Sequence, residues 1–227
     1  MEKRTLILGS YNTAGYGWTL AACKISKAQQ MQTFIHVPGR HAPLDLSTAL
    51  TDGQPYYDTA GLEATLECSI GDRPERQRLL HTLVNYLDGK SLPIVHPDHP
   101  GHYLMGRIQA FPLYSDLAHC ALQISAICDP WLYASQETGV SLIAEDVEKT
   151  ALLALTGRMA VTPTITVDGE INLVYGSNSW ALSTGEHILP DLHLTPGEYP
   201  GEPGLHEITY SGTGTVSIKW REAVLAA

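Results

Sequence analysis

The chain has 227 residues, of which 44% are hydrophobic, and a formal net charge of −10 at pH 7. This length and composition allow one large hydrophobic core or two small ones. The negative charge argues against general nucleic-acid binding, which needs a basic face, and no apolar run approaches the roughly 20 residues of a membrane span. The N-terminus also lacks the apolar stretch of a secretory signal, so we expect neither nucleic-acid sequence recognition nor membrane insertion.

Residues 1–133 are expected to form one β domain, in which the segment Leu62–Ile70 has the clearest strand pattern. Apolar residues occupy every second position from Leu62, and acidic Glu63 and Glu67 lie between them. Since side chains alternate between the two faces of a strand, this pattern predicts a half-buried strand of an antiparallel sheet. Further strands are expected at Thr5–Leu8, Trp18–Lys24, Thr33–Val37, Leu92–His96, Tyr103–Phe111 and Ala118–Ile127.

A single helix is expected from about residue 73 to residue 88. Asp72 can accept the backbone N–H of Glu75 as an N-cap, and Pro74 fits the first turn, where its missing N–H is not needed. Leucine and valine then recur at helical spacing and form one apolar stripe, and Gly89 is expected to end the helix. One helix among strands predicts a sheet with a helix packed across it.

A second domain is expected over residues 134–227, and its first residues, 134–139, are a polar candidate link. Short strands separated by turns rich in Gly, Asp and Pro follow, which is typical of a β-sandwich or jelly roll. Three of these turns are expected at Asp168-Gly169, Thr184-Gly185-Glu186 and Ser211-Gly212-Thr213-Gly214. The predicted fold class is therefore mainly β, with one α-helix in the first domain.

The residues that could support catalysis form no recognisable constellation. The sequence contains no Gly-x-Ser-x-Gly elbow and no Gly-rich phosphate loop. Glu63 and Glu67 would lie about 13 Å apart along one strand, which exceeds the carboxylate separation of a glycosidase. We therefore expect no enzymatic activity and no cofactor.

Metal binding is also not expected. The four cysteines contain no Cys-x-x-Cys pair, which favours buried free thiols in a protein made in a reducing cytoplasm. His96, His99 and His102 flank Asp98 at a spacing that could hold zinc. Proline and glycine make this segment the tip of a hairpin, however, and nothing would orient the ligands rigidly. We expect a solvated, potentially pH-sensitive turn.

Aromatic residues of the second domain raise the alternative of a carbohydrate-binding module that contacts host-cell glycans. Trp220 alternates with Val216 and Ile218 and is expected in the core. Tyr199 lies in a loop and is the best candidate for an exposed aromatic glycan contact.

A set of short motifs follows a fixed order from Pro38 almost to the C-terminus. The motifs are Pro38-Gly39-Arg40, Leu44-Asp45-Leu46-Ser47, the strand and helix above, Arg107-Ile108, Asp129-Pro130-Trp131, Pro163–Val167, Leu192–Gly197 and Thr215–Arg221. This order resembles the distal tail protein family of bacteriophages with long, non-contractile tails, and the resemblance covers nearly the whole chain.

The resemblance implies a structural virion protein of the tail tip, made in the host bacterial cytoplasm. The N-terminal domain would form a ring, usually of six copies, and the C-terminal domain would be a galectin-like β-sandwich. The ring would be an adaptor that joins the tail tube to the hub, fibre or receptor-binding proteins, with the tape measure protein as a further candidate partner. No catalytic activity is implied.

A closed ring needs an interface in which one patch meets a different patch of the neighbour. The loop that contains Arg40 and Asp45 is the first candidate, because a guanidinium can bind a carboxylate or carbonyl across the interface. The acidic strand face with Glu63 and Glu67, together with Arg107, offers complementary charge.

Overall fold

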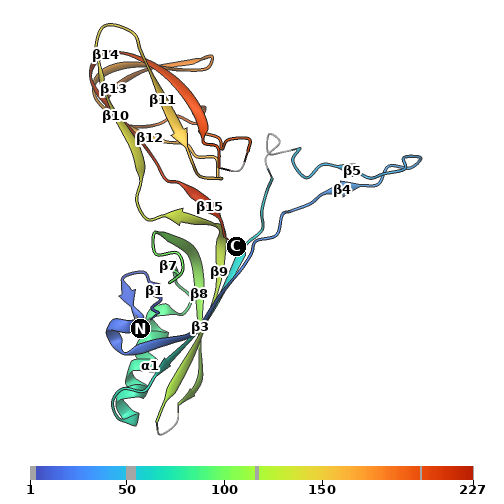
Figure 1. Cartoon of the computed structure of the whole chain (residues 1–227), viewed down its shortest axis with the longest axis vertical. Coiled ribbons are helices and arrows are strands. Elements are labelled where there is room, and N and C mark those ends of the chain that lie inside the picture. Colours follow the sequence, from blue (N-terminus) through green and yellow to red (C-terminus); the bar gives the residue numbers. More distant parts are fainter. Residues whose placement is uncertain (1–3, 50–54, 116–117, 200, 227) are drawn as a thin grey trace. The chain divides into compact units, whose positions relative to one another are not determined.

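The computed structural model describes residues 4–49, 55–115, 118–199 and 201–226 (Figure 1). The chain divides into two compact units, residues 1–132 with 225–227 and residues 133–224. Each unit has its own hydrophobic core. Strands dominate both units, and the described residues contain one α-helix, α1. The expected mainly β fold with one helix is thus confirmed.

The first unit is built on an eight-stranded sheet in the order β2-β1-β7-β8-β9-β6-β3, and β15 also pairs with β9. The predicted hairpin of the two strands around residues 92–111 is confirmed, since β7 and β8 pair in antiparallel register. The strands are β1 (Ile7–Leu8), β2 (Tyr11–Asn12), β3 (Trp18–Ser26), β6 (Ala60–Cys68), β7 (Ser91–Val95), β8 (His102–Ser115), β9 (Cys120–Ala134) and β15 (Ala223–Leu225).

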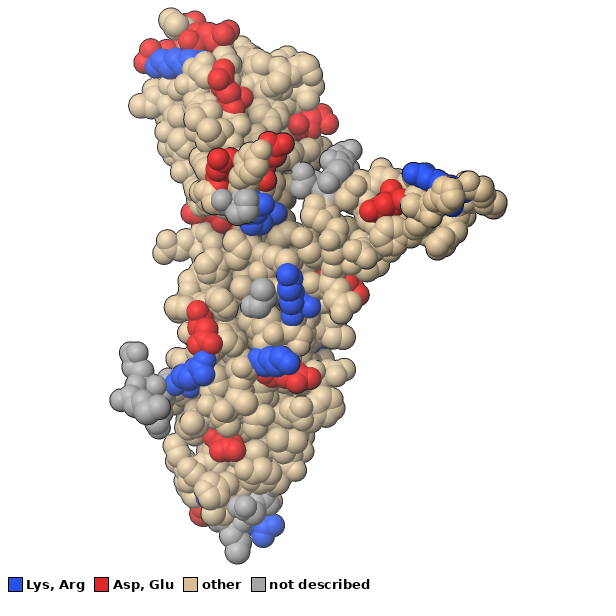
Figure 2. Space-filling view, turned by 45° about the vertical axis from the view of Figure 1, so that its right-hand side comes forward, with Lys and Arg blue, Asp and Glu red and all other residues tan. Residues whose placement is uncertain are grey.

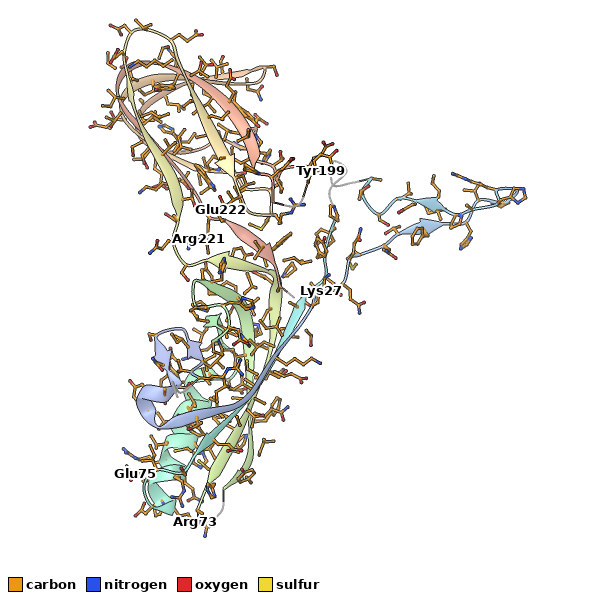
Figure 3. The ribbon with its side chains drawn as sticks, in the orientation of Figure 1. Lys27, Arg73, Glu75, Tyr199, Arg221 and Glu222 are labelled. Atoms are coloured by element: carbon orange, nitrogen blue, oxygen red, sulfur yellow. The ribbon has the colours of Figure 1, made fainter. Side chains whose placement is uncertain are left out.

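The helix α1 (Arg73–Leu87) begins and ends as its sequence predicts. The side chain of Asp72 accepts the backbone N–H of Glu75 at 3.0 Å, and Figure 3 shows Glu75 in the first turn. Asp88 caps the C-terminus, and Gly89 follows with a φ of +75°, which glycine adopts without strain. The predicted stripe faces the core of the first unit through Leu80, Leu83 and Leu87.

The strand β6 has the predicted two faces. Leu62 and Leu66 are fully buried, whereas Glu63 and Glu67 are exposed. The strand ends at Cys68, two residues earlier than expected, and Ile70 is 51% exposed. The alternating pattern therefore continues past the strand into the exposed segment that leads to α1.

The second unit contains one sheet in the order β10-β14-β12-β13, and β11 pairs with β14 as well. Because β10 and β11 pair with different halves of the long strand β14, the sheet curls around a single apolar core. Trp220 is buried in this core, as predicted. The strands are β10 (Thr138–Ala144), β11 (Lys149–Leu155), β12 (Thr164–Tyr175), β13 (Asn178–Ile188) and β14 (Gly204–Trp220).

Three of the turns that the sequence predicted at glycines of this unit are not turns; they lie inside β12, β13 and β14. The turn predicted at Gly176 does join β12 to β13. Gly169, Gly212 and Gly214 have φ angles of +125°, +126° and +116°, and a Cβ at any of them would collide with backbone of the opposite strand. Here glycine permits close strand approach and local bending, which is its other common role in sheets.

The two ends of the second unit are held together by Arg221 and Glu222 (Figure 3). Arg221 donates to the carbonyl of Ala134 at 2.8 Å and forms an ion pair with Glu137 at 3.0 Å. Glu222 accepts the indole N–H of Trp220 at 2.9 Å and two backbone N–H groups of the segment after β11. Within the described residues, no helix combines the length and apolar character needed to cross a membrane.

Candidate assembly surfaces

A two-stranded hairpin of β4 (Phe34–Ile35) and β5 (Leu44–Asp45) forms a sheet separate from the others (Figure 1). We call residues 29–49 the arm. At its tip the N–H of Arg40 donates to the carbonyl of Val37 at 3.1 Å, and Gly39 has a φ of +84°. Proline followed by glycine with positive φ is the signature of a type II turn. This turn places Arg40 at the exposed end of the arm.

Every residue of the arm from 31 to 45 is exposed, including large apolar side chains. Exposed fractions range from 36% for Leu44 to 50% for Phe34. Isolated exposed apolar residues are common, but a continuous group of them usually marks an interaction surface. The exposed apolar residues are Met31, Phe34, Ile35, Val37 and Leu44.

Hydrogen bonds hold the arm together at its base. The carboxylate of Asp45 accepts the N–H of Ser47 at 2.9 Å and its hydroxyl at 2.5 Å. These bonds hold the pKa of Asp45 below its ordinary value. The hydroxyl of Ser47 in turn accepts the N–H of Thr33 at 2.9 Å. Asp45 therefore has a structural role inside its own hairpin.

The outer face of the eight-stranded sheet carries the acidic residues predicted for an interface. Glu63 lies directly opposite Lys24 on β3 and Ser125 on β9. Glu67 lies opposite Thr19 and Ala121, which are both uncharged. The same strand therefore presents one carboxylate beside a cation of its own chain and one beside uncharged neighbours.

Arg107 lies on β8 and is separate from the acidic face of β6. Its guanidinium donates to the carbonyl of Gly89 at 2.7 Å, just after α1. The predicted interface residues thus fall in three places: the arm, the face of β6 and the start of β8. The sequence did not predict a fourth exposed group, Phe111 and Leu113, which lie on β8 and are 49% and 48% exposed.

The histidine turn differs from the expected solvated one, because His96 is only 5% exposed. Its Nδ1 accepts the N–H of Asp98 at 3.2 Å, and desolvation lowers the pKa of the imidazole. The guanidinium of Arg4 binds Asp98 at 2.5 Å and lowers the pKa of that carboxyl. In the described parts of the chain, no group of three or more His, Cys, Asp or Glu side chains could hold a metal ion.

Tyr199 is 63% exposed in the loop between β13 and β14 (Figure 3). Arg158 donates to the carbonyls of Gly197 and Tyr199 at 3.2 and 3.3 Å, which restrains this loop. Tyr210 is buried, and Tyr175 is half-buried, so neither shares the exposure of Tyr199.

A buried histidine holds the start of the same loop. The hydroxyl of Tyr175 donates to the carbonyl of His193 at 2.9 Å, so it accepts from Nδ1 of His206 at 2.8 Å. The other ring nitrogen of His206 then accepts the N–H of Thr195 at 2.9 Å. The part of the loop that leads to Tyr199 is therefore held by Tyr175, His206 and Arg158.

The structure is similar to solved proteins of phage tails. It matches the Dit protein of phage SPP1, which is described as a paradigm of the hub adsorption apparatus in phages that infect Gram-positive bacteria. The TM-score is 0.67 and the sequence identity is 14%, over 97% of this chain and 99% of the SPP1 protein. The chain has the fold of a phage distal tail protein.

A protein from the activated baseplate of phage P2 with calcium has a TM-score of 0.51 and 8% identity over 98% of both chains. At the level of sequence, neither a protein-family model nor a curated protein matches the chain. The fold expected from the sequence resemblance is thus confirmed over 97% of the chain, and at such low identity the likeness concerns the fold alone.

Proposed function

We propose that the chain is a non-enzymatic structural subunit of a ring-shaped adaptor in a phage tail tip. The observation that carries this proposal is the likeness to the SPP1 Dit protein, which extends over 97% of the chain. The ring, usually of six copies, would join the tail tube to the hub or receptor-binding proteins, and the tape measure protein is a further candidate partner. The mature protein would be part of the virion.

The arm supplies the contact between neighbouring subunits. Its exposed apolar side chains, among them Phe34 and Ile35, belong to neither hydrophobic core of the described chain, and all residues from 31 to 45 are exposed. Packing them against a neighbour would remove apolar surface from water, at about 25 cal/mol per Å². Such an interface joins two different patches, as a closed ring requires.

Charge sets the register of this contact. Arg40 lies at the tip of the arm, where a guanidinium can form charge-assisted hydrogen bonds with a carboxylate. Glu67 is the better acceptor on the neighbouring subunit, because Glu63 already lies opposite Lys24. Arg107 stays a candidate for the subunit interface, although its guanidinium already donates to the carbonyl of Gly89 in its own chain.

Native mass spectrometry of matched variants tests the role of the arm. The double substitution Phe34→Ser and Ile35→Ser, and separately Arg40→Glu, should shift the protein from a ring to a monomer. Ile143→Ser is the control, because Ile143 is 68% exposed on β10 of the second unit. A ring that survives both arm changes would remove the arm from the interface.

Glycan binding by the second unit is a second candidate function. It is favoured by the restrained loop that presents Tyr199, since an ordered exposed aromatic ring loses little entropy on binding. A glycan array with the wild type and with Tyr199→Ala tests it. Binding that persists in the variant, or no binding at high protein concentration, would count against this role.

A further inference from the structure

One edge strand of the second unit lacks the features that usually protect a free sheet edge. Within the described part of the chain, β14 is the only strand partner of β11, and their seven residue pairs run without a register shift. The sequence of β11 contains no Pro or Gly, and its only charge is at its first residue, Lys149. Open edges pair readily with other strands, so natural proteins usually interrupt them with charges, proline or bulges.

Two other edge strands of the described chain carry such interruptions. In β3, the pairing with β6 shifts register between Leu20 and Ala22, and Lys24 places a charge within the strand. In β13, the pairing with β12 shifts between Val167 and Glu170, and Glu186 lies in the strand. The edge strand β10 pairs with the other half of β14, also without a register shift or a charge, but it contains Gly139 near its start. The uninterrupted edge of β11 is therefore not shared by these three strands.

Apolar side chains accompany this edge. Leu152 on β11 is 58% exposed, and Leu205 on the adjacent β14 is 59% exposed. Leu205 lies opposite Ala154, so Leu152 and Leu205 occupy the same face at diagonal positions. An added strand beside β11 would lie next to Leu152, with Leu205 one strand further away.

The negative charge of the second unit indicates which kind of segment would bind beside β11. Residues 133–224 contain four Lys and Arg but twelve Asp and Glu, a net charge of −8 out of −10 for the whole chain. On the face in Figure 2, acidic side chains outnumber basic ones over this unit. Glu207 lies directly opposite Leu152, and Glu145 and Glu148 precede β11. Repulsion between like charges disfavours a second copy of this unit as the occupant.

We propose that the free edge of β11 binds an extended segment of another protein, in which apolar residues alternate with lysine or arginine. The segment adds a strand to the sheet through its main chain. Because side chains alternate between faces, its cations lie on the outer face with Leu152 and Glu207, and its apolar side chains lie on the inner face beside Leu153 and Leu155. This proposal does not depend on ring formation, because the edge lies within the second unit of one chain.

Fluorescence anisotropy with two labelled peptides tests the proposal on the full-length protein. One seven-residue peptide, matched in length to β11, alternates valine with lysine, and the other alternates valine with glutamate. The substitution Leu152→Lys should weaken binding of the lysine peptide about tenfold or more, by adding a like charge on the face that the peptide's lysines occupy. Ile188→Lys is the matched control, since Ile188 is 64% exposed on the opposite edge strand β13.

Hydrogen exchange locates the bound peptide independently of any variant. The lysine peptide should bind, lose affinity as salt rises, and slow exchange over Lys149–Leu155. Failure to bind, protection elsewhere, or equal weakening by both substitutions would overturn the proposal. Equal binding of the glutamate peptide would overturn the assignment of a basic partner.

Discussion

Lys24 on β3 and Glu63 on β6 are direct cross-strand partners on the outer face of the larger sheet. Their opposite charges are matched within one chain, and such a pair contributes roughly 0.2–1 kcal/mol to the stability of a sheet. The next carboxylate on that face of β6, Glu67, has no charged residue directly opposite it on either neighbouring strand. Glu63 and Glu67 therefore differ in their surroundings, although both occupy exposed positions in the alternating pattern of β6.

The different surroundings of Glu63 and Glu67 predict that their substitutions affect ring assembly unequally. Glu67→Ala should shift the equilibrium from ring to monomer, because it removes the carboxylate assigned to the neighbour's Arg40. Glu63→Ala should leave assembly nearly unchanged and cost at most about 1 kcal/mol of stability. Sedimentation velocity of both variants at equal concentration measures the difference. A larger loss of assembly for Glu63→Ala would reverse the assignment.

The N-cap of α1 gives a prediction about stability. Replacing Asp72 with alanine removes the acceptor for the N–H of Glu75 and should lower the free energy of unfolding by about 1 kcal/mol. Asp72→Asn keeps an acceptor and should recover most of that loss. Urea denaturation followed by circular dichroism checks both variants. Equal stability of Asp72→Ala and the wild type would show that the cap contributes nothing.

The glycines where β12 and β14 approach each other give a second stability prediction. A Cβ on Gly214 would collide with the backbone carbonyl of Asp168, so Gly214→Ala should destabilise the second unit by about 3 kcal/mol or more. Gly176→Ala is the control: its φ of +58° is also positive, but a Cβ there meets open space. That change should cost only about 1 kcal/mol. Thermal unfolding of both variants provides the comparison.

The buried imidazole of His96 predicts that stability depends on pH. Because burial lowers the pKa of His96 in the folded state, the unfolded chain binds a proton more readily. Stability should therefore fall as the pH drops below about 6.5, the ordinary pKa of histidine. Urea unfolding at about pH 7.5 and 5.5 measures the fall.

A variant separates His96 from the other histidines. His96→Asn keeps an acceptor for the N–H of Asp98 but does not titrate in this range. The variant should therefore lose less stability between the two pH values than the wild type. The same pH dependence in both proteins would assign the effect to other groups.

Local patterns allowed part of the fold to be predicted from the sequence. The cap at Asp72 and the alternation from Leu62 to Cys68 depend on near neighbours, so α1 and β6 appeared where expected. The glycines at Gly169 and Gly214 predict turns from the sequence, because glycine is common both in turns and at bends within strands. Only the pairing of distant strands distinguishes them.

The candidate surfaces were less predictable, because exposure depends on tertiary structure. The segment around Phe34 reads as an ordinary strand, and nothing local indicates that both of its faces are exposed. Conversely, His96 adjoins a polar turn but is buried, because it directly follows the inner strand β7. The exposed position of Tyr199 did follow from its place in a loop.

The most direct test of the proposed ring is the mass of the purified full-length protein by light scattering, with negative-stain images of the same sample. The proposal predicts a closed ring, formed either alone, with a mass that is a whole multiple of 24.7 kDa, or after addition of a tail-tube protein, with the mass of that protein added. A protein that remains a monomer at high concentration and with the tail-tube protein present would contradict it.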